Sequence, residues 1–221
     1  MPETIKVDVW SDIACPWCFI GKRKLESGIA AFDELNPDGE VDVEFHSFEL
    51  SPDTPVDFEG SEIDFLAKFK GMPEEQVKGM LANVTTAAQE VGLNYDFDAL
   101  QHTRTVKAHQ LLHFAKAQGK QLETEERLMQ AYFEEGRHVG RDEDLADLAV
   151  EVGLDRDEVL KSLAADEYLS AVEADQAQAV EYGIRGVPFF VIDGKYGISG
   201  AQAPETFTEV FQKITEEKAA T

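Results

Sequence analysis

Two cysteines, Cys15 and Cys18, are the residues of this chain best suited to chemistry, and both lie in the tetrapeptide Cys15-Pro16-Trp17-Cys18. The surrounding pattern predicts a strand over 5–10 and a helix from about residue 18. Cysteines three positions apart in the first turn of a helix can close a small disulfide ring, and the free N–H groups there stabilise a thiolate. The thiolate is the nucleophilic form of cysteine, so this position favours reactivity of the first cysteine. We therefore interpret Cys15 as a nucleophile and Cys18 as the resolving thiol.

The cysteine pair has three other interpretations. A structural disulfide across two residues would constrain little of the chain and would stabilise it little. A zinc site normally needs four ligands, whereas the sequence holds no second cysteine pair. Two unrelated buried cysteines could share this spacing, although the Pro16-Trp17 insert at the start of a helix argues against chance. The spacing favours redox chemistry.

Length and composition fit one large domain or two small ones. The chain has 221 residues, of which 43% are hydrophobic, enough for a sizeable core. Residues 1–6 lack the pattern of a signal peptide, and no run approaches the about 18 apolar residues of a membrane span. We therefore expect a cytoplasmic protein without membrane contact, in which an isolated cysteine pair is reactive.

The chain is strongly acidic, with 44 Asp and Glu against 20 Lys and Arg and a net charge of −24. Such a field repels phosphate backbones and anionic membranes, so we expect no nucleic-acid partner. The excess is spread along the chain and accompanies a normal apolar content. This composition favours a halophilic source in which salt screens the charges, with an acidic protein from an ordinary source as the alternative.

The first 60 residues alternate strand and helix patterns. Residues 5–10 and 41–48 alternate apolar and polar side chains, and a helix pattern covers 18–35 between them. This β-α-β order favours a parallel pair of strands. An irregular stretch that contains prolines follows, and the pattern from 63 to 163 is helical throughout. We expect a domain junction near residue 60.

Strand patterns return near the C-terminus. A helix pattern over 166–182 leads into an apolar run at 187–192, the hairpin signal Asp193-Gly194 and a returning strand at 195–199. Pro204 is suited to begin a last helix, to about residue 217. The expected layout is β-α-β, a helical insertion, and α-β-β-α, which belongs to the α/β class.

At this point the sequence resembles the DsbA family, a thioredoxin fold interrupted by a helical domain, and within it the cytosolic FrnE-like branch. The resemblance covers nearly the whole chain. Such proteins commonly carry Asn-Thr before the Ala-His pair, where this chain has Arg104-Thr105. The segments that carry the resemblance are Asp12-Ile13-Ala14-Cys15-Pro16-Trp17-Cys18-Phe19-Ile20-Gly21-Lys22, Ala108-His109, Ala131-Tyr132-Phe133-Glu134-Glu135-Gly136, Gly186-Val187-Pro188-Phe189-Phe190 and Ser199-Gly200-Ala201-Gln202.

The resemblance implies a thioredoxin-like fold interrupted by an all-helical insertion domain. The thioredoxin-like domain would comprise 1–60 and 166–221, and the insertion 61–165. It implies a disulfide oxidoreductase of the DsbA type whose cofactor is its own internal disulfide, with glutathione as a conceivable co-substrate. Its partners would be protein or small-molecule thiols and disulfides, and the chain would be a monomer or a homodimer.

The resemblance also assigns substrate-binding residues. Val187-Pro188 matches the position where this fold places a cis-proline beside the cysteine pair, so the backbone of Val187 could pair with an extended substrate. Pro16 removes one N–H from the active-site turn, and Trp17 offers an apolar face beside the sulfurs. Because Trp17 carries no ionisable group, we do not expect a very strongly oxidising potential.

Three further residues are candidates for auxiliary roles. Asp12 could move a proton to or from Cys18, cap the following helix, or face water. His109 and His113 share a helical face at metal-binding spacing, but the pattern offers no third ligand, so we expect no metal and assign His109 to packing or to the substrate site. Gln202 ends a segment that either caps the last helix or lies near the substrate.

Two other functions compete with disulfide exchange. Glutathione-dependent isomerases and transferases of the kappa type, such as 2-hydroxychromene-2-carboxylate isomerase, share the architecture but typically present Ser where this chain has Cys15. A holdase would instead present an apolar groove of the helical block to unfolded chains. The pair of cysteines favours exchange over both.

Overall fold

The computed structural model describes residues 4–37 and 39–220, and it builds one four-stranded sheet from both ends of the chain. The strands are β1 (Ile5–Ser11), β2 (Val41–Ser47), β3 (Phe189–Ile192) and β4 (Tyr196–Ser199). Their order is β2-β1-β3-β4, in which β1 and β2 are parallel and the other pairs antiparallel. The predicted parallel β-α-β unit is confirmed.

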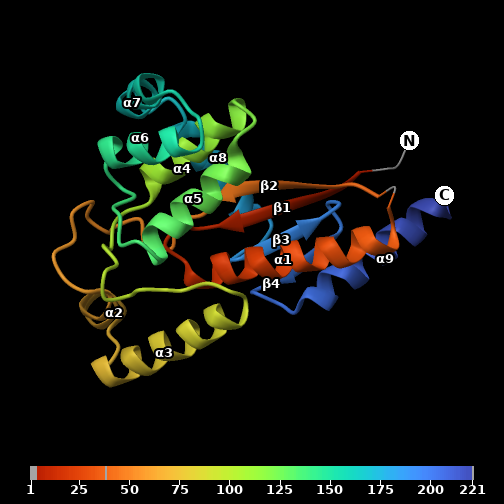
Figure 1. The fold of residues 1–221 in the computed structure, drawn as a ribbon, viewed down its shortest axis with the longest axis horizontal. Coiled ribbons are helices and arrows are strands. Elements are labelled where there is room, and N and C mark those ends of the chain that lie inside the picture. The colour runs from red at the N-terminus through yellow and green to blue at the C-terminus, as the bar shows by residue number, and fades with distance from the viewer. Residues whose placement is uncertain (1–3, 38, 221) are drawn as a thin grey trace.

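Helices flank the sheet and fill the interval between β2 and β3 (Figure 1). Within the described residues, no helix has the length and apolar composition needed to cross a lipid bilayer. The helices are α1 (Pro16–Leu35), α2 (Glu62–Lys70), α3 (Glu74–Glu90), α4 (Val106–Ala117), α5 (Gln121–Phe133), α6 (Asp142–Glu151), α7 (Arg156–Ala164), α8 (Leu169–Glu181) and α9 (Pro204–Ala219).

The side chains of β1 point alternately to the two faces of the sheet. Ile5, Val7 and Val9 are buried against α1 and α9, which pack on each other along one face of the sheet (Figure 1). Trp10 points to the opposite face, where it joins Ala179 of α8 and donates its indole N–H to a backbone carbonyl of that helix. Period-two burial on both faces is what places the sheet between two helical layers.

The helical block has a core of its own, and that core reaches the cysteines. The apolar side chains on one face of α3, including Val77, Val84 and Ala88, are buried. Cys18, Phe19 and other residues of the first turns of α1 join the same cluster as the buried residues of α3 to α7. Later turns of α1 belong to the core of the sheet. Helix α1 is thus shared between two cores.

One side chain of the helical block hydrogen-bonds to the free edge of strand β2. The Gln121 amide accepts from the backbone N–H of Phe45 (3.0 Å) and donates to its carbonyl (2.8 Å). It therefore makes the two hydrogen bonds that a neighbouring strand would make there. An unpaired edge is a site for aggregation, so this contact also protects the sheet.

Several boundaries differ from the sequence predictions. Helix α1 begins at Pro16 rather than near residue 18, since proline suits the first helical position. Helix α8 begins at Leu169 rather than 166, because Asp166 adopts a positive φ of 50° and its carboxylate accepts from Lys107 and Gln110. The Asp193-Gly194 hairpin is confirmed, with positive φ at both residues. The division into domains at 60 and 166 stays a prediction.

Candidate active site

The cysteine pair lies at the N-terminus of α1. Cys15 is the N-cap residue, with extended backbone angles, and Cys18 lies in the first turn, where its N–H donates to the Cys15 carbonyl (3.0 Å). Both thiols are free and nearly buried, with 4% and 2% of their surface exposed. The expected geometry is therefore present, with the first sulfur at the positive end of the helix and the second behind it.

The segment around Pro188 faces the first cysteine. The Val187–Pro188 peptide bond is cis, and the Cys15 thiol points at the Val187 carbonyl at 3.6 Å. The Pro188 carbonyl accepts from the N–H of Gly200 (2.8 Å), which joins this segment to the loop after β4. The fold thus brings together four of the predicted residues from opposite ends of the chain, Cys15, Cys18, Val187 and Pro188.

The environment of Cys18 suits a thiol that reacts second. Burial and the neighbouring Cys15 raise the pKa of Cys18 well above its ordinary value, while the backbone of Asp12 and the hydroxyl of Ser11 oppose that rise. Desolvation disfavours the charged form of a thiol, so Cys18 stays protonated in the resting protein. Its attack must therefore be preceded or accompanied by loss of a proton.

Asp12 is buried and organises the loop before Cys15 instead of facing water. Its carboxylate accepts from the N–H groups of Ala14 (3.3 Å) and Leu50 (2.8 Å). Burial opposes its ionisation, but His109, the Leu50 N–H and Thr105 lower the pKa of Asp12 below its usual range. Asp12 therefore remains a carboxylate that ties the active-site loop to the segment after β2.

His109 lies beneath that carboxylate. Its Nε2 is 3.4 Å from Asp12 Oδ1, within ion-pair distance but not aligned as a hydrogen bond. Burial works against protonation, but the nearby carboxylates raise the pKa of His109. His113 points elsewhere, to Asp175 at 3.0 Å, so the two histidines do not share a ligand position.

Three residues near the cysteines are not predicted from the sequence. The Tyr95 hydroxyl donates to the Pro16 carbonyl (2.7 Å), and the Ser11 hydroxyl donates to Glu125 Oε1 (3.1 Å). Tyr95 lies between helices, where no periodicity marks it. The sequence does mark Glu125 as unusual, because this charged residue falls within the apolar stripe of α5 that includes Leu128. The structure shows that it is fully buried.

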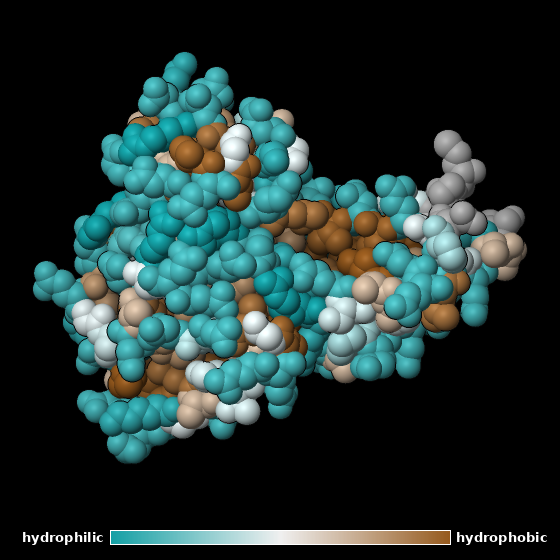
Figure 2. Space-filling model, in the orientation of Figure 1, coloured by the Kyte–Doolittle hydropathy of each residue, from teal (hydrophilic) through white to brown (hydrophobic). Residues whose placement is uncertain are grey.

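An apolar cleft opens beside Cys15. Its volume is about 320 Å³, and Trp17, with 43% of its surface exposed, stands at its wall. Gln202 lies outside it, where its exposed side chain donates to the Ser199 carbonyl. Figure 2 shows apolar residues gathered over α3 on this side of the molecule. The cleft lining includes Cys15, Pro16, Trp17, Leu50, Phe65, Leu66, Lys70, Met80, Leu81, Val84, Phe97, His102, Phe133 and Val187.

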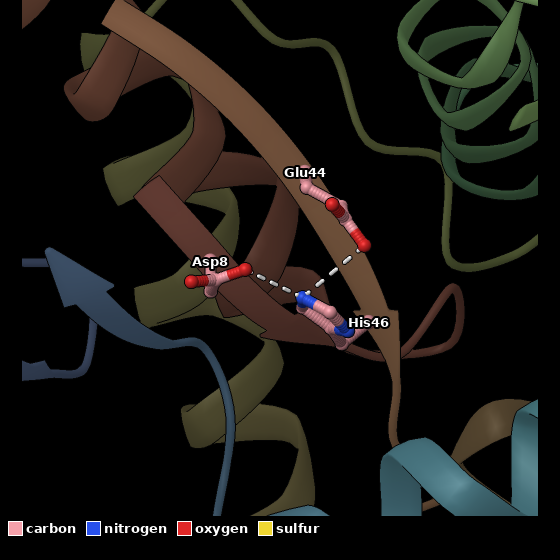
Figure 3. Close-up of side chains that lie close together, drawn as sticks. All are labelled: Asp8, Glu44 and His46. Atoms are coloured by element: carbon pink, nitrogen blue, oxygen red, sulfur yellow. Dashed lines mark hydrogen bonds and ion pairs between the residues drawn. The ribbon is translucent and has the colours of Figure 1, made fainter. Parts of the chain in front are cut away.

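A second cluster of polar side chains lies on the sheet, away from the cysteines (Figure 3). Asp8, Glu44 and His46 place ligand-type atoms within 4.8 Å of one another. His46 is already bonded on both ring nitrogens, to Asp8 (2.8 Å) and Asp175 (2.9 Å). Despite burial, these carboxylates raise the pKa of His46 to about 9. A protonated imidazole has no lone pair for a metal, so we interpret the cluster as an ion-pair network.

A four-stranded sheet with a Cys-x-x-Cys pair at a helix N-terminus, facing a cis-proline, defines a protein of the thioredoxin fold. The family model "DSBA-like thioredoxin domain" matches residues 6–212, and the chain belongs to that family.

Two relatives match over nearly their whole length. A crystal structure of a probable DsbA oxidoreductase from Streptomyces coelicolor has a TM-score of 0.86 at 38% identity and covers 95% of this chain and 89% of that one. The uncharacterized protein YwbO of Bacillus subtilis is 30% identical over 97% of this chain and 100% of its own length.

Two more distant structures share the fold alone. The cytosolic disulfide reductase DsbM of Pseudomonas aeruginosa, solved with GSH, has a TM-score of 0.66 at 19% identity, covering 96% and 99% of the two chains. A 2-hydroxychromene-2-carboxylate isomerase has a TM-score of 0.70 at 12% identity, covering 97% and 98%. The same fold therefore occurs both in a disulfide reductase and in an isomerase.

Proposed function

We propose that this protein is a DsbA-type thiol–disulfide oxidoreductase in which Cys15 exchanges with external disulfides and Cys18 resolves the intermediate. One observation carries the proposal, which is the position of the Cys15 sulfur between the N-terminus of α1 and the Val187 carbonyl, with Cys18 directly behind it. A sulfur at a helix N-terminus is stabilised as the thiolate, which is the form that attacks a disulfide.

The exchange proceeds in two balanced steps. The Cys15 thiolate attacks one sulfur of a substrate disulfide, a Cys15–substrate disulfide forms, and the other substrate sulfur leaves as a thiolate. Cys18 then loses its proton and attacks the Cys15 sulfur, which releases the second substrate thiolate and leaves the Cys15–Cys18 disulfide. The substrate is reduced and the pair is oxidised; the reverse sequence oxidises a dithiol.

The surroundings supply substrate binding. The apolar cleft and Trp17 favour an apolar segment of a polypeptide, and its backbone would lie against Pro16 and Val187 of the cleft lining. Pro188 acts through its cis bond to Val187. Asp12 and His109 act by holding the active-site loop, and Gln202 belongs to the loop beside Pro188. We also infer that the chain belongs to the FrnE-like branch. We further infer a cytoplasmic location, which the cytosolic DsbM, a fold neighbour, supports.

A glutathione-dependent isomerase is the alternative, favoured by the shared fold of the isomerase and by the GSH bound to DsbM. In that case Cys15 would hold a glutathione adduct that Cys18 does not resolve. A holdase would use the same cleft without the thiols. Full suppression of aggregation by a Cys15→Ser, Cys18→Ser double variant would favour the holdase.

The test is an equilibrium titration against glutathione redox buffers in concentrated salt, read by intact mass after acid quench. The wild type should lose two hydrogens at a definable potential without a lasting adduct. Cys18→Ser should accumulate one glutathione, and Cys15→Ser should acquire none at the active site. A wild type that stays reduced, or that keeps a stable adduct, would contradict the exchange and support the alternatives.

A further inference from the structure

The cis-proline segment borders a second hollow besides the apolar cleft. This shallow depression has a volume of about 360 Å³, and its lining includes Arg185, Gly186, Pro188 and Gly200. Val187 lines both the depression and the cleft that contains Cys15. The two hollows therefore meet at the residue whose carbonyl faces the reacting sulfur.

Arg185 is the charged residue of this depression, and its side chain is exposed. The other arginines of the chain each form an ion pair with an Asp or Glu side chain, namely Arg23, Arg104, Arg127, Arg137, Arg141 and Arg156. Among the described residues, Arg185 alone of the arginines has no carboxylate partner, although the chain holds 44 acidic against 20 basic side chains. Its guanidinium is therefore available to a ligand.

The backbone next to Arg185 offers a second donor. Within the part of the chain that the structure describes, the Gly186 N–H donates to no acceptor. A Cβ at Gly186 would meet nothing within 4 Å, so the approach to this N–H is open. A guanidinium and a neighbouring free N–H together suit an anion, and a planar guanidinium matches the two oxygens of a carboxylate.

A substrate that lies across Val187 places residues in both hollows. Arg185 is two positions from Val187, so their Cα atoms are at most about 7 Å apart. An extended substrate covers the same distance in about two residues. The cleft takes the apolar residues on one side of the substrate cysteine, and Arg185 is within reach of a side chain close to that cysteine on the other side.

We propose that the depression around Arg185 is a second substrate subsite, which binds a carboxylate close to the reacting cysteine of the substrate. The inference rests on the proposed exchange and adds a charge to its substrate class. The substrate carries apolar residues on one side of the cysteine and an acidic group on the other. An acidic side chain of a polypeptide and a carboxylate of glutathione both present this group. Arg185 holds it and takes no part in the exchange of sulfurs.

The test compares substrates that differ in one charge. Short peptides, blocked at both ends, are linked through their cysteine to thiopyridone, a neutral leaving group. Each peptide has leucines on one side of the cysteine and a single Glu, Gln or Lys on the other, in both chain directions. Attack by Cys15 on the peptide sulfur releases thiopyridone, which is followed by absorbance. The measurements use the lowest KCl concentration at which circular dichroism shows the native fold.

The variants change the charge at one position. Arg185→Gln removes it and Arg185→Glu reverses it, and the fold should tolerate both because this side chain is exposed. The control Lys161→Gln removes an exposed cation from α7 and changes the net charge by the same amount as Arg185→Gln.

The reduced wild type should react about two- to fivefold faster with the Glu peptide than with the Gln peptide in one chain direction, as expected for an exposed ion pair. Arg185→Gln should abolish this preference, and Lys161→Gln should keep it. Arg185→Glu should prefer the Lys peptide, which a merely structural role of Arg185 would not produce. The preference should decline as KCl is raised, because salt screens exposed charges.

Glutathione and its diethyl ester, linked to the same leaving group, separate the two sources of the carboxylate. A preference for free glutathione that Arg185→Gln abolishes, without any preference among the peptides, would assign the subsite to glutathione. Equal rates within both substrate series, or a preference that Arg185→Gln leaves unchanged, would overturn the subsite and leave the proposed exchange intact. A wild type that releases no thiopyridone from any substrate would overturn the exchange, and the subsite with it.

Discussion

His46 lies at the centre of the ion-pair network on the sheet, and its protonation should stabilise the fold. Although burial lowers it, the hydrogen bonds to Asp175 and Asp8 raise the pKa of His46 from 6.5 to about 9. Each pKa unit corresponds to about 1.4 kcal/mol, so the folded state gains about 3 kcal/mol from binding this proton. The side chain is only 10% exposed, so solvent screening reduces this figure little.

The pH dependence follows from the direction of that shift. A base whose pKa is higher in the folded state stabilises fully at pH values below its unfolded pKa, here near 6.5. The stabilisation is then lost as the pH rises through about 9. Asp175→Asn removes the carboxylate that contacts both His46 and His113, and it should lower the free energy of unfolding by about 2–3 kcal/mol near pH 6. The difference from the wild type should shrink above pH 9.

Urea unfolding of both proteins at a series of pH values, in the same concentrated salt, measures this difference. Other groups with raised pKa values, such as Glu125 and His109, are present in both proteins and cancel in the comparison. Glu173→Gln, which removes an exposed carboxylate from the same helix, should follow the wild type. Parallel curves for wild type and Asp175→Asn across this range would refute the reasoning.

Three other predictions concern packing, the active-site turn and charge. Gly21→Ala would place its Cβ 2.9 Å from Pro188 Cγ, so it should lower the free energy of unfolding by about 1–2 kcal/mol in thermal unfolding. The Cβ of Gly79→Ala would meet nothing within 4 Å, so this helical substitution should raise the free energy of unfolding by about 1 kcal/mol. Equal effects of the two substitutions would contradict the packing argument. Tyr95→Phe removes the hydrogen bond to the Pro16 carbonyl and should lower the free energy of unfolding by about 1 kcal/mol in urea. An unchanged free energy of unfolding would show that water replaces the Tyr95 hydroxyl as donor. Raising KCl from dilute to molar should raise the unfolding midpoint, because the screening length falls to about 3 Å; a constant midpoint would argue against self-repulsion by the net charge of −24.

The sequence predicts the sheet better than it predicts the site. Strands such as 5–10 alternate strictly, and Asp193-Gly194 has few conformations available, so local chemistry determines both. Where Cys15 and Val187 meet depends on a contact across 172 positions, which only the family resemblance indicated. The start of α8 is missed because Asp166 is held by residues of α4.

The polar groups beneath the cysteines show why side-chain networks escape prediction. Asp12 has three plausible positions from sequence, and only the folded chain shows it bonded to the Leu50 N–H. Glu125 interrupts an apolar stripe, which marks it as unusual, but its partner Ser11 lies 114 positions away. Such pairs are selected by tertiary packing, not by local propensity.

The two ends of helix α1 are packed into different hydrophobic cores. The first turns of α1, with Cys18 and Phe19, are packed into the helical block, whereas Leu25 and Phe32 anchor the rest of the helix to the sheet that carries Pro188. Val187 also packs against the core of the helical block, so the block contacts both sides of the gap between Cys15 and the proline segment. The width of the substrate-facing gap is therefore set by how the helical block is docked on the sheet, and residues far from the sulfurs can adjust it.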